Sequence, residues 1–267
     1  MTPTPFNLQF LGSGNAWTKP PANFHTNVLV SCNQNSWLID CGTLCPLALH
    51  HLGIPLRNID AAFISHLHGD HVLGLEELLL HRLFCEHRTI DLFLPAGLFT
   101  EHSGIEGADI WQNCLRASLE TPDVSTHPPR MLSLSDYASV HKLIPGSPSN
   151  IFGLTVDIFP VEHIPMRPCY GIMLDHRVAY TSDCTFSRPR LEELFNKGVS
   201  TVFHDVCFTC PGIGCVHTAF DDLATLPRDM AERIILMHYA DDLQDTHIRR
   251  AIDMGFRFAH QGEIFSF

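Results

Sequence analysis

Short apolar runs of β type alternate with helical patterns along nearly the whole chain. The first half contains helical patterns over residues 46–52 and 72–82 and the runs FNLQFLG, TNVLVSC, SWLIDCG and AAFISH. The second half contains helical patterns near 189–197, 218–226 and 241–254 and the runs LTVDIFPVEH, CYGIMLDH, RVAYTSD, TVFHDV, RIILMHY and FRFAH. Strands that alternate with helices, but also follow one another as hairpins, predict mixed sheets covered by helices.

The two halves are separated by a less regular part at about residues 98–150, which is rich in Pro and Ser. It contains one helical pattern, over 108–120. Because the chain shows no low-complexity linker and no fixed-period repeat, we expect a single domain over 1–267 with an insertion at about 98–150. A long insertion of this kind fits a lid over a site, a dimer contact or a surface decoration equally well.

Composition narrows the class of protein. A chain of 267 residues, 45% of them apolar, can fill a large core. The net charge of -12 argues against a protein whose main task is to bind long nucleic acid. No apolar run approaches the roughly 18 residues of a membrane span, and the N-terminal residues lack a secretion signal, so we expect a cytoplasmic protein with no membrane partner. Its ten cysteines do not form a dense disulfide pattern, which favours free thiols or metal ligands.

Three histidines and an aspartate crowd the segment FISHLHGDHVLGLEELL, residues 63–79. The apolar run before them predicts a buried strand and the run after them an amphipathic helix, so His66, His68, Asp70 and His71 lie in a loop at the carboxyl end of a strand. A chain with 18 His produces such a word by chance about once in two hundred times. The alternative to a metal site is a polar helix-capping loop with incidental histidines.

The spacing within this motif favours two metal ions over one. Two residues apart in extended chain, His66 and His68 can point to the same side, whereas Asp70 and His71 turn toward a second point at the helix entrance. Imidazole and carboxylate donors fit Zn, Mn or Fe.

The chain resembles the metallo-β-lactamase superfamily, and more closely its ribonuclease Z-like phosphodiesterase branch. The motifs that carry the resemblance are SHLHGDH followed by GL, and, earlier in the chain, LIDCG and LGSGNAW. The resemblance extends from Leu11 to about His260. It implies an α/β (α+β) fold, a four-layer αββα sandwich of two mixed β-sheets flanked by helices, with a dinuclear metal site at one edge of the two sheets.

The resemblance also implies three further ligands, each at the end of a β run: His163 in FPVEHIP, Asp183 in AYTSDC and His238 in ILMHY. One metal ion would then be held by His66, His68 and His163, the other by Asp70, His71 and His238, with Asp183 bridging the two. The implied cofactors are two divalent metal ions, with Zn favoured over Mn or Fe.

Two further residues carry the expected chemistry. His217, in a His-Thr pair, matches the branch's motif, which implies that it protonates the leaving oxygen; a solvent-exposed helix-end histidine is the alternative. Asp70 is the second expected catalytic residue, as an acceptor for the attacking water. Asp40, at the end of a strand, is expected either to orient a ligand histidine or to cap a turn. Asp205 is expected to support the site, and His204 to be structural.

The cysteines Cys207, Cys210 and Cys215 fit either a structural metal clip or ordinary loop thiols, since one Cys-x2-Cys pair is weak evidence.

His163 and Asp183 are only 20 residues apart, which leaves no room for the long Gly-rich arm of the tRNA-processing members. We therefore expect a small phosphodiester substrate, such as a cyclic nucleotide or cyclic phosphate. A lactone, thioester or other carboxyl-ester hydrolase is the enzyme alternative, and a non-catalytic metal-dependent sensor is the minor one. By analogy with the branch, the partner is a second copy of the chain in a homodimer.

Overall fold

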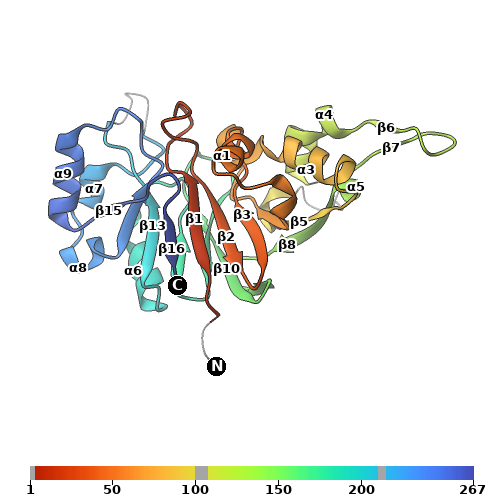
Figure 1. Ribbon diagram of the computed structural model, residues 1–267. Coiled ribbons are helices and arrows are strands. Elements are labelled where there is room, and N and C mark those ends of the chain that lie inside the picture. The colour runs from red at the N-terminus through yellow and green to blue at the C-terminus, as the bar shows by residue number, and fades with distance from the viewer. Residues whose placement is uncertain (1–3, 100–107, 210–214) are drawn as a thin grey trace.

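The computed structural model describes residues 4–99, 108–209 and 215–267 of the chain. Two seven-stranded sheets lie face to face in the middle, and helices cover their outer faces (Figure 1). The apolar side chains form three clusters, one between the sheets and one between each sheet and its helices. This arrangement confirms the predicted four-layer αββα sandwich with mixed sheets.

The first sheet contains a hairpin meander followed by parallel strands. In spatial order its strands are β16 (Ile264–Ser266), β1 (Asn7–Gly12), β2 (Asn27–Cys32), β3 (Asn35–Ile39), β4 (Ala61–Phe63), β5 (Ile90–Pro95) and β8 (Ala138–Leu143). Pairing is antiparallel from β16 to β3 and parallel from β3 to β8. The turn between β2 and β3 places Asn33 and Gln34 at φ 49° and 69°, the left-handed backbone that tight hairpins require.

The second sheet is likewise divided into an antiparallel part and a parallel part. Its strands, in spatial order, are β15 (Arg257–Phe258), β14 (Ile234–Met237), β13 (Thr201–Asp205), β12 (Val178–Tyr180), β11 (Cys169–Leu174), β10 (Leu154–Val161) and β9 (Ser149–Ile151). Pairing is antiparallel from β9 to β12 and parallel from β12 to β15. The parallel strands β12, β13 and β14 end at one edge of the sheet, and residues that follow these ends can meet there.

The helices follow the expected segments with shifted ends. The first sheet is covered by α1 (Cys45–His51), α2 (Gly69–Val72) and α3 (Leu75–Phe84), and the second by α6 (Arg188–Asn196), α7 (Phe220–Leu223), α8 (Arg228–Ala231) and α9 (Asp245–Met254). Short 3-10 turns lie at η1 (Leu56–Asn58) and η2 (Ala96–Leu98). No helix in the described part of the chain is long and apolar enough to cross a membrane.

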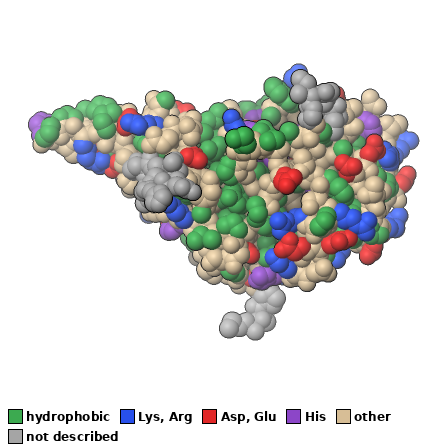
Figure 2. Space-filling view, turned by 180° about the vertical axis from the view of Figure 1, so that it is seen from behind, with side chains coloured by type: hydrophobic (Ala, Val, Ile, Leu, Met, Phe, Trp, Pro, Cys, Tyr) green, Lys and Arg blue, Asp and Glu red, His purple; other side chains and the backbone are tan. Residues whose placement is uncertain are grey.

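The range 98–150 contains both added structure and sheet strands. A π-helical turn, η4 (Trp111–Leu115), and α4 (Arg116–Leu119) occupy the predicted helical stretch; α5 (Leu134–Tyr137) leads into β8. Between them β6 (Pro122–Asp123) and β7 (Arg130–Met131) form a narrow arm that projects from the body (Figures 1 and 2). The last part of the range supplies β8 and most of β9, which form one edge of each sheet.

Candidate metal centre

The seven predicted metal ligands lie together where strands of both sheets end. The first sheet contributes the motif after β4, in which the short helix α2 begins at Gly69 and carries two of the residues. The second sheet contributes one residue beyond β10, one beyond β12 and one directly after β14. Their ligand atoms form two groups, each spanning at most 4.8 Å: His66, His68, His163 and Asp183, and Asp70, His71, Asp183 and His238. A third group of the same size joins Asp183 to Asp205 and His217.

The first group brings three imidazole nitrogens toward one point. His68 Nδ1 lies 3.0 Å from His66 Nε2 and 3.2 Å from His163 Nε2. An Asp183 carboxylate oxygen lies 3.7 Å from His163 Nε2 and 3.9 Å from His66 Nε2. Burial lowers the pKa of all three histidines, so they are neutral and each can present a lone pair. Neutral imidazoles around a carboxylate are the donor set that a divalent ion requires.

The second group contains a buried ring nitrogen that fits a cation. His71 donates its Nδ1 proton to Asp40, 2.7 Å away. Its Nε2 lies 3.3 Å from Asp183 and 3.4 Å from Asp70, and has no hydrogen-bond partner among the described residues. Burial lowers the pKa of His71, but the carboxylates of Asp183, Asp70 and Asp40 raise it well above the ordinary value. A proton therefore takes the position that a divalent ion would occupy, and metal binding would displace it.

A chain of hydrogen bonds behind the two groups fixes the rings. The fully buried Asp40 accepts bonds from the Ser65 backbone N–H and hydroxyl, both at 2.8 Å, besides that from His71. Because the Ser65 hydroxyl proton goes to Asp40, His66 donates its Nδ1 proton to Ser65 Oγ, 3.0 Å away, and keeps Nε2 free. Ser182 donates to the same Ser65 oxygen at 2.8 Å.

Of the two roles that the sequence left open for Asp40, its bond with His71 favours the one that orients a predicted ligand. The roles of Ser65 and Ser182 are not apparent from the sequence. The one available signal is their position, each directly before a predicted ligand at the end of a strand.

Three residues among or near the predicted metal ligands have a left-handed backbone conformation. Asp40, Ser182 and His238 have φ of 63°, 57° and 59°. These are left-handed values that residues other than glycine adopt at a cost of order 1–3 kcal/mol each. Each of the three terminates a strand and turns its side chain or the next one into the site. Hydrogen bonds with Ser65 and His71 hold the Asp40 side chain, and one with Ser65 holds that of Ser182.

His217 lies against the metal groups. Its ring stacks on that of His238 at a centroid distance of 5.2 Å, and its Nδ1 lies 2.8 Å from an Asp205 carboxylate oxygen. Burial alone would lower the pKa of His217, but Asp205 and, more weakly, Asp183 raise it to about 9. His217 is therefore cationic at neutral pH, with Nε2–H free because Nδ1 donates to Asp205.

Five of the seven predicted metal ligands, together with His217, line one large cavity. It has a volume of about 960 Å³, and its inner end is lined by Asp70, His163, Asp183, His217 and His238. Its outer wall includes Trp17 and Lys19 from the β1–β2 loop and Phe208, Asp241 and His247 from the second half. A second cavity of about 510 Å³, next to Arg167 and Asn113, meets the first at His68 and His163.

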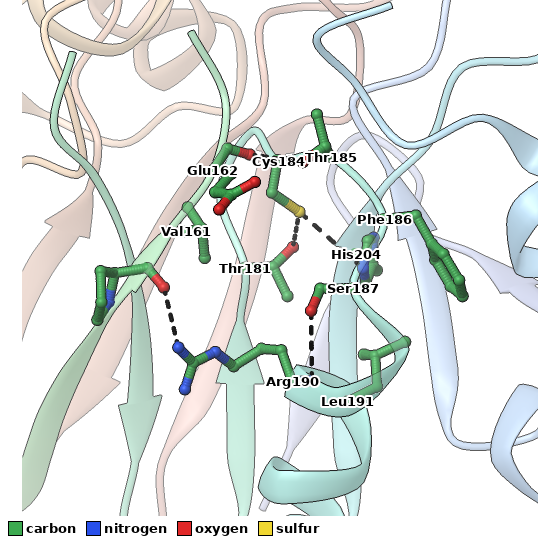
Figure 3. A pocket seen from close by; sticks show the side chains of 11 residues that line it. Val161, Glu162, Thr181, Cys184, Thr185, Phe186, Ser187, Arg190, Leu191 and His204 are labelled. Carbon is green, nitrogen blue, oxygen red and sulfur yellow. Dashed lines mark hydrogen bonds between the residues drawn. The ribbon is translucent and has the colours of Figure 1, made fainter. Parts of the chain in front are cut away.

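A smaller cavity of about 200 Å³ is lined by Cys184, His204 and residues of α6 (Figure 3). Here His204 Nε2 is 4.0 Å from the thiol of Cys184, while His204 Nδ1 donates to the Asp205 carbonyl at 2.8 Å. The backbone of Cys184 donates to Asp205 at 3.1 Å and accepts from Thr218 Oγ1 at 2.9 Å. His204 and Cys184 are thus part of the framework beneath Asp205, in keeping with a structural His204.

The cysteines after β13 differ among themselves. Cys207 is a free, partly buried thiol, whereas Cys215 is disulfide-bonded. Cys210 lies outside the described residues. A disulfide removes the Cys215 sulfur as a thiolate ligand, so this structure does not form the three-thiolate clip. The preference for thiols that are all free or metal-bound is also wrong for Cys215.

Comparison with known proteins gives matches along almost the whole chain. Residues 6–265 match the sequence model of the family described as Anti-Pycsar protein Apyc1. A relative of that name from Paenibacillus sp. (strain J14) is 34% identical over 261 residues, which cover 97% of this chain and 98% of the relative.

Solved structures share the fold at lower identity. A metallo-β-lactamase fold protein, YhfI from Bacillus subtilis, is 16% identical and superposes with a TM-score of 0.74 over 98% of this chain and all of the other. The short form of human tRNase Z is 19% identical, with a TM-score of 0.63 over 97% of this chain and 98% of the other. These likenesses confirm the predicted metallo-β-lactamase fold.

Proposed function

The chain belongs to the Anti-Pycsar protein Apyc1 family, and from this premise we propose that it hydrolyses a small cyclic phosphodiester of the cyclic-nucleotide class. It is a metal-dependent hydrolase of the phosphodiesterase type. We assign His66, His68 and His163 to one metal ion, Asp70, His71 and His238 to the other, and Asp183 to both. This assignment rests on the two groups of ligand atoms and on the buried, unpartnered His71 Nε2.

The observation that carries the proposal is the position of His217 beside the two metal groups, where its Nδ1 lies 4.0 Å from an Asp183 carboxylate oxygen. Its Nδ1 is fixed by Asp205, and its ring lies against those of His163 and His238. Two cations and a protonated imidazole in one cavity suit a substrate that carries negative charge and gains more in the transition state. A phosphodiester has that charge, whereas a lactone or a thioester is neutral.

The side chains have separate tasks in this reaction. Two bound divalent ions, for which we propose zinc, would supply an activated water and neutralise charge on the phosphoryl oxygens. Asp70 accepts a hydrogen bond from the attacking water, which orients its lone pair toward phosphorus. On the other side His217 donates its Nε2 proton to the leaving sugar oxygen. Asp205 keeps the His217 ring in the tautomer and orientation that this transfer needs.

A substrate screen combined with one variant tests the function. We expect the metal-loaded protein to hydrolyse 3′,5′-cyclic nucleotides and bis(p-nitrophenyl) phosphate, and to leave lactones and thioesters intact. His217→Ala should retain its metal content, because His217 is outside both ligand groups, and lose about 10²–10⁴-fold in turnover. His50→Ala, at an exposed position on α1, is the matched control and should keep wild-type activity.

Three results would contradict the proposed function or the role of His217. Lactone opening without phosphodiester cleavage would indicate the carbonyl-hydrolase alternative. Near-wild-type phosphodiester turnover in a metal-replete His217→Ala protein would remove the proposed proton donor. Tight binding of cyclic nucleotide with no hydrolysis in metal-replete protein would instead support the sensor.

Three finer expectations from the sequence stay predictions. Elemental analysis of purified protein will identify the metal, since imidazole and carboxylate donors also accept Mn and Fe. Light scattering in solution will show whether the chain forms a homodimer. A cytoplasmic location can be checked by fractionation.

A further inference from the structure

Trp17 stands at the outer wall of the metal cavity with 84% of its surface exposed. Large aromatic side chains in a soluble protein are normally buried, and an exposed one that lines a site is often a contact for a ligand. We propose that Trp17 is the platform on which the nucleobase of the substrate stacks. The inference rests on the proposed cyclic-nucleotide function and names the residue that recognises the base.

Trp17 is the aromatic side chain of this cavity whose ring is free. Phe208 also lines the cavity, but it stacks against Phe220 at 4.6 Å and against His247 at 5.2 Å. Within residues 4–99, 108–209 and 215–267, the indole of Trp17 makes no ring contact and no side-chain hydrogen bond. Base stacking needs an open aromatic face, and Trp17 provides it.

The loop that carries Trp17 is fastened to the segment that follows the predicted ligand His238. Asn15 accepts the backbone N–H of Trp17 at 3.0 Å and donates its own to the Tyr239 carbonyl at 3.2 Å. The Asp241 carboxylate accepts the Lys19 backbone N–H at 2.7 Å and the Thr18 hydroxyl. These bonds hold the backbone that carries Trp17 in place relative to the metal groups, and leave the indole uncovered.

The size and charge of the cavity fit a nucleoside on this side of the metal groups. A volume of about 960 Å³ lies at the upper end of the range for small-molecule sites, which is far more than a bare phosphodiester fills. The carboxylates of Asp241 and Asp242 lie on the outer wall, away from the inner end that we assign to the metal ions. Lys19 on the same wall offsets part of this charge, and the net negative charge that remains favours a neutral base with amino donors over a phosphate. The phosphate therefore points inward and the base toward Trp17.

A pair of substrates separates base recognition from chemistry. In Trp17→Ala, kcat/KM for a 3′,5′-cyclic nucleotide should fall about fivefold to 150-fold, the equivalent of about 1–3 kcal/mol of stacking. The loss should be mainly in KM. Turnover of ribose 3′,5′-cyclic phosphate, which has no base, should be unchanged, and Trp17→Phe should recover most of the nucleotide activity. An equal loss on both substrates, as expected if a second copy of the chain covers Trp17, or no loss on either, overturns the proposal.

Fluorescence gives a second measurement that does not depend on hydrolysis. Of the three tryptophans, Trp37 and Trp111 are 0% and 2% exposed, so a stacked base can quench only Trp17. Adding cyclic nucleotide to metal-loaded His217→Ala protein should quench its emission, and the added substitution Trp17→Phe should abolish the quenching. Quenching without hydrolysis by wild-type protein would refute the proposed function and uphold the platform. Hydrolysis by the wild-type protein without any quenching would uphold the proposed function and refute the stacking of the base on Trp17.

Discussion

Gly42 offers a direct test of how closely the β3–α1 loop supports the histidine motif. A Cβ atom at this position would lie 1.7 Å from the Asp70 carbonyl oxygen and 2.1 Å from its carbon, both backbone atoms that no rotamer change can move. Restoring a contact of 3.0 Å requires a shift of about 1.3 Å, whereas a metal site tolerates about 0.5 Å. Overpacking of this kind costs about 1–3 kcal/mol. Gly42→Ala should therefore lower the melting temperature by about 2–12 °C in a protein of this size.

The assay is metal affinity together with thermal unfolding. Because Asp70 and His71 move with the displaced loop, a chelator competition should show metal binding weakened by at least tenfold, the usual effect of disturbing the support of a ligand. Gly69→Ala, in the same motif, is the matched control for affinity and stability. Its Cβ would meet only the flexible end of Leu73 at 3.0 Å. If Gly42→Ala matches wild type in metal affinity and melting temperature, the β3–α1 loop does not pack as closely against the Asp70 backbone as the structure shows.

Two further perturbations test the centre itself. Asp40→Ala removes the acceptor for His71 Nδ1 and for Ser65, so we expect metal affinity to fall about 10–100-fold; wild-type affinity in a chelator titration would show that Asp40 does not position the ligand. Removing metal with a chelator should abolish hydrolysis and lower the melting temperature by about 5–11 °C relative to protein with metal at 100 times its Kd, a difference of about 2.7 kcal/mol. Added Zn²⁺ should restore both, and a chelated protein that keeps its activity would refute a metal-dependent site.

The part of the centre that could be predicted is the part encoded locally. His66, His68, Asp70 and His71 lie within six residues at a strand end, so one sequence word and one element pattern place them. His163, Asp183 and His238 needed the family resemblance as well, because each is a single residue with no second ligand-type residue at metal-motif spacing beside it. Ser65 and Ser182 are recognisable only in three dimensions, since their hydroxyls meet across 117 positions of sequence.

The weaker predictions concern segments whose sequence carries little pattern. The strand β16, three residues long, pairs with β1 at the opposite end of the chain, and such a short edge strand has no distinctive alternation. The strands β8 and β9 lie at sheet edges with exposed positions among their buried ones, which makes them resemble loop. The proposed role of Trp17 could not be predicted from the sequence either. A single exposed aromatic residue in a turn is not part of any periodic pattern, and its role is inferred from the cavity beside it.

Because the proposed ligands are divided between the two sheets, the metal centre cannot be completed while the ribosome is still making the second half. The first four ligands leave the ribosome early, but His238 follows 167 positions after His71. The strand that closes the first sheet beside β1 comes later still, at Ile264–Ser266. At a synthesis rate of about 5–20 residues per second, the nascent chain carries an exposed half-site of histidines for several seconds. Metal loading is therefore a step that follows synthesis, and the cell's free metal at that moment decides which ion the enzyme receives.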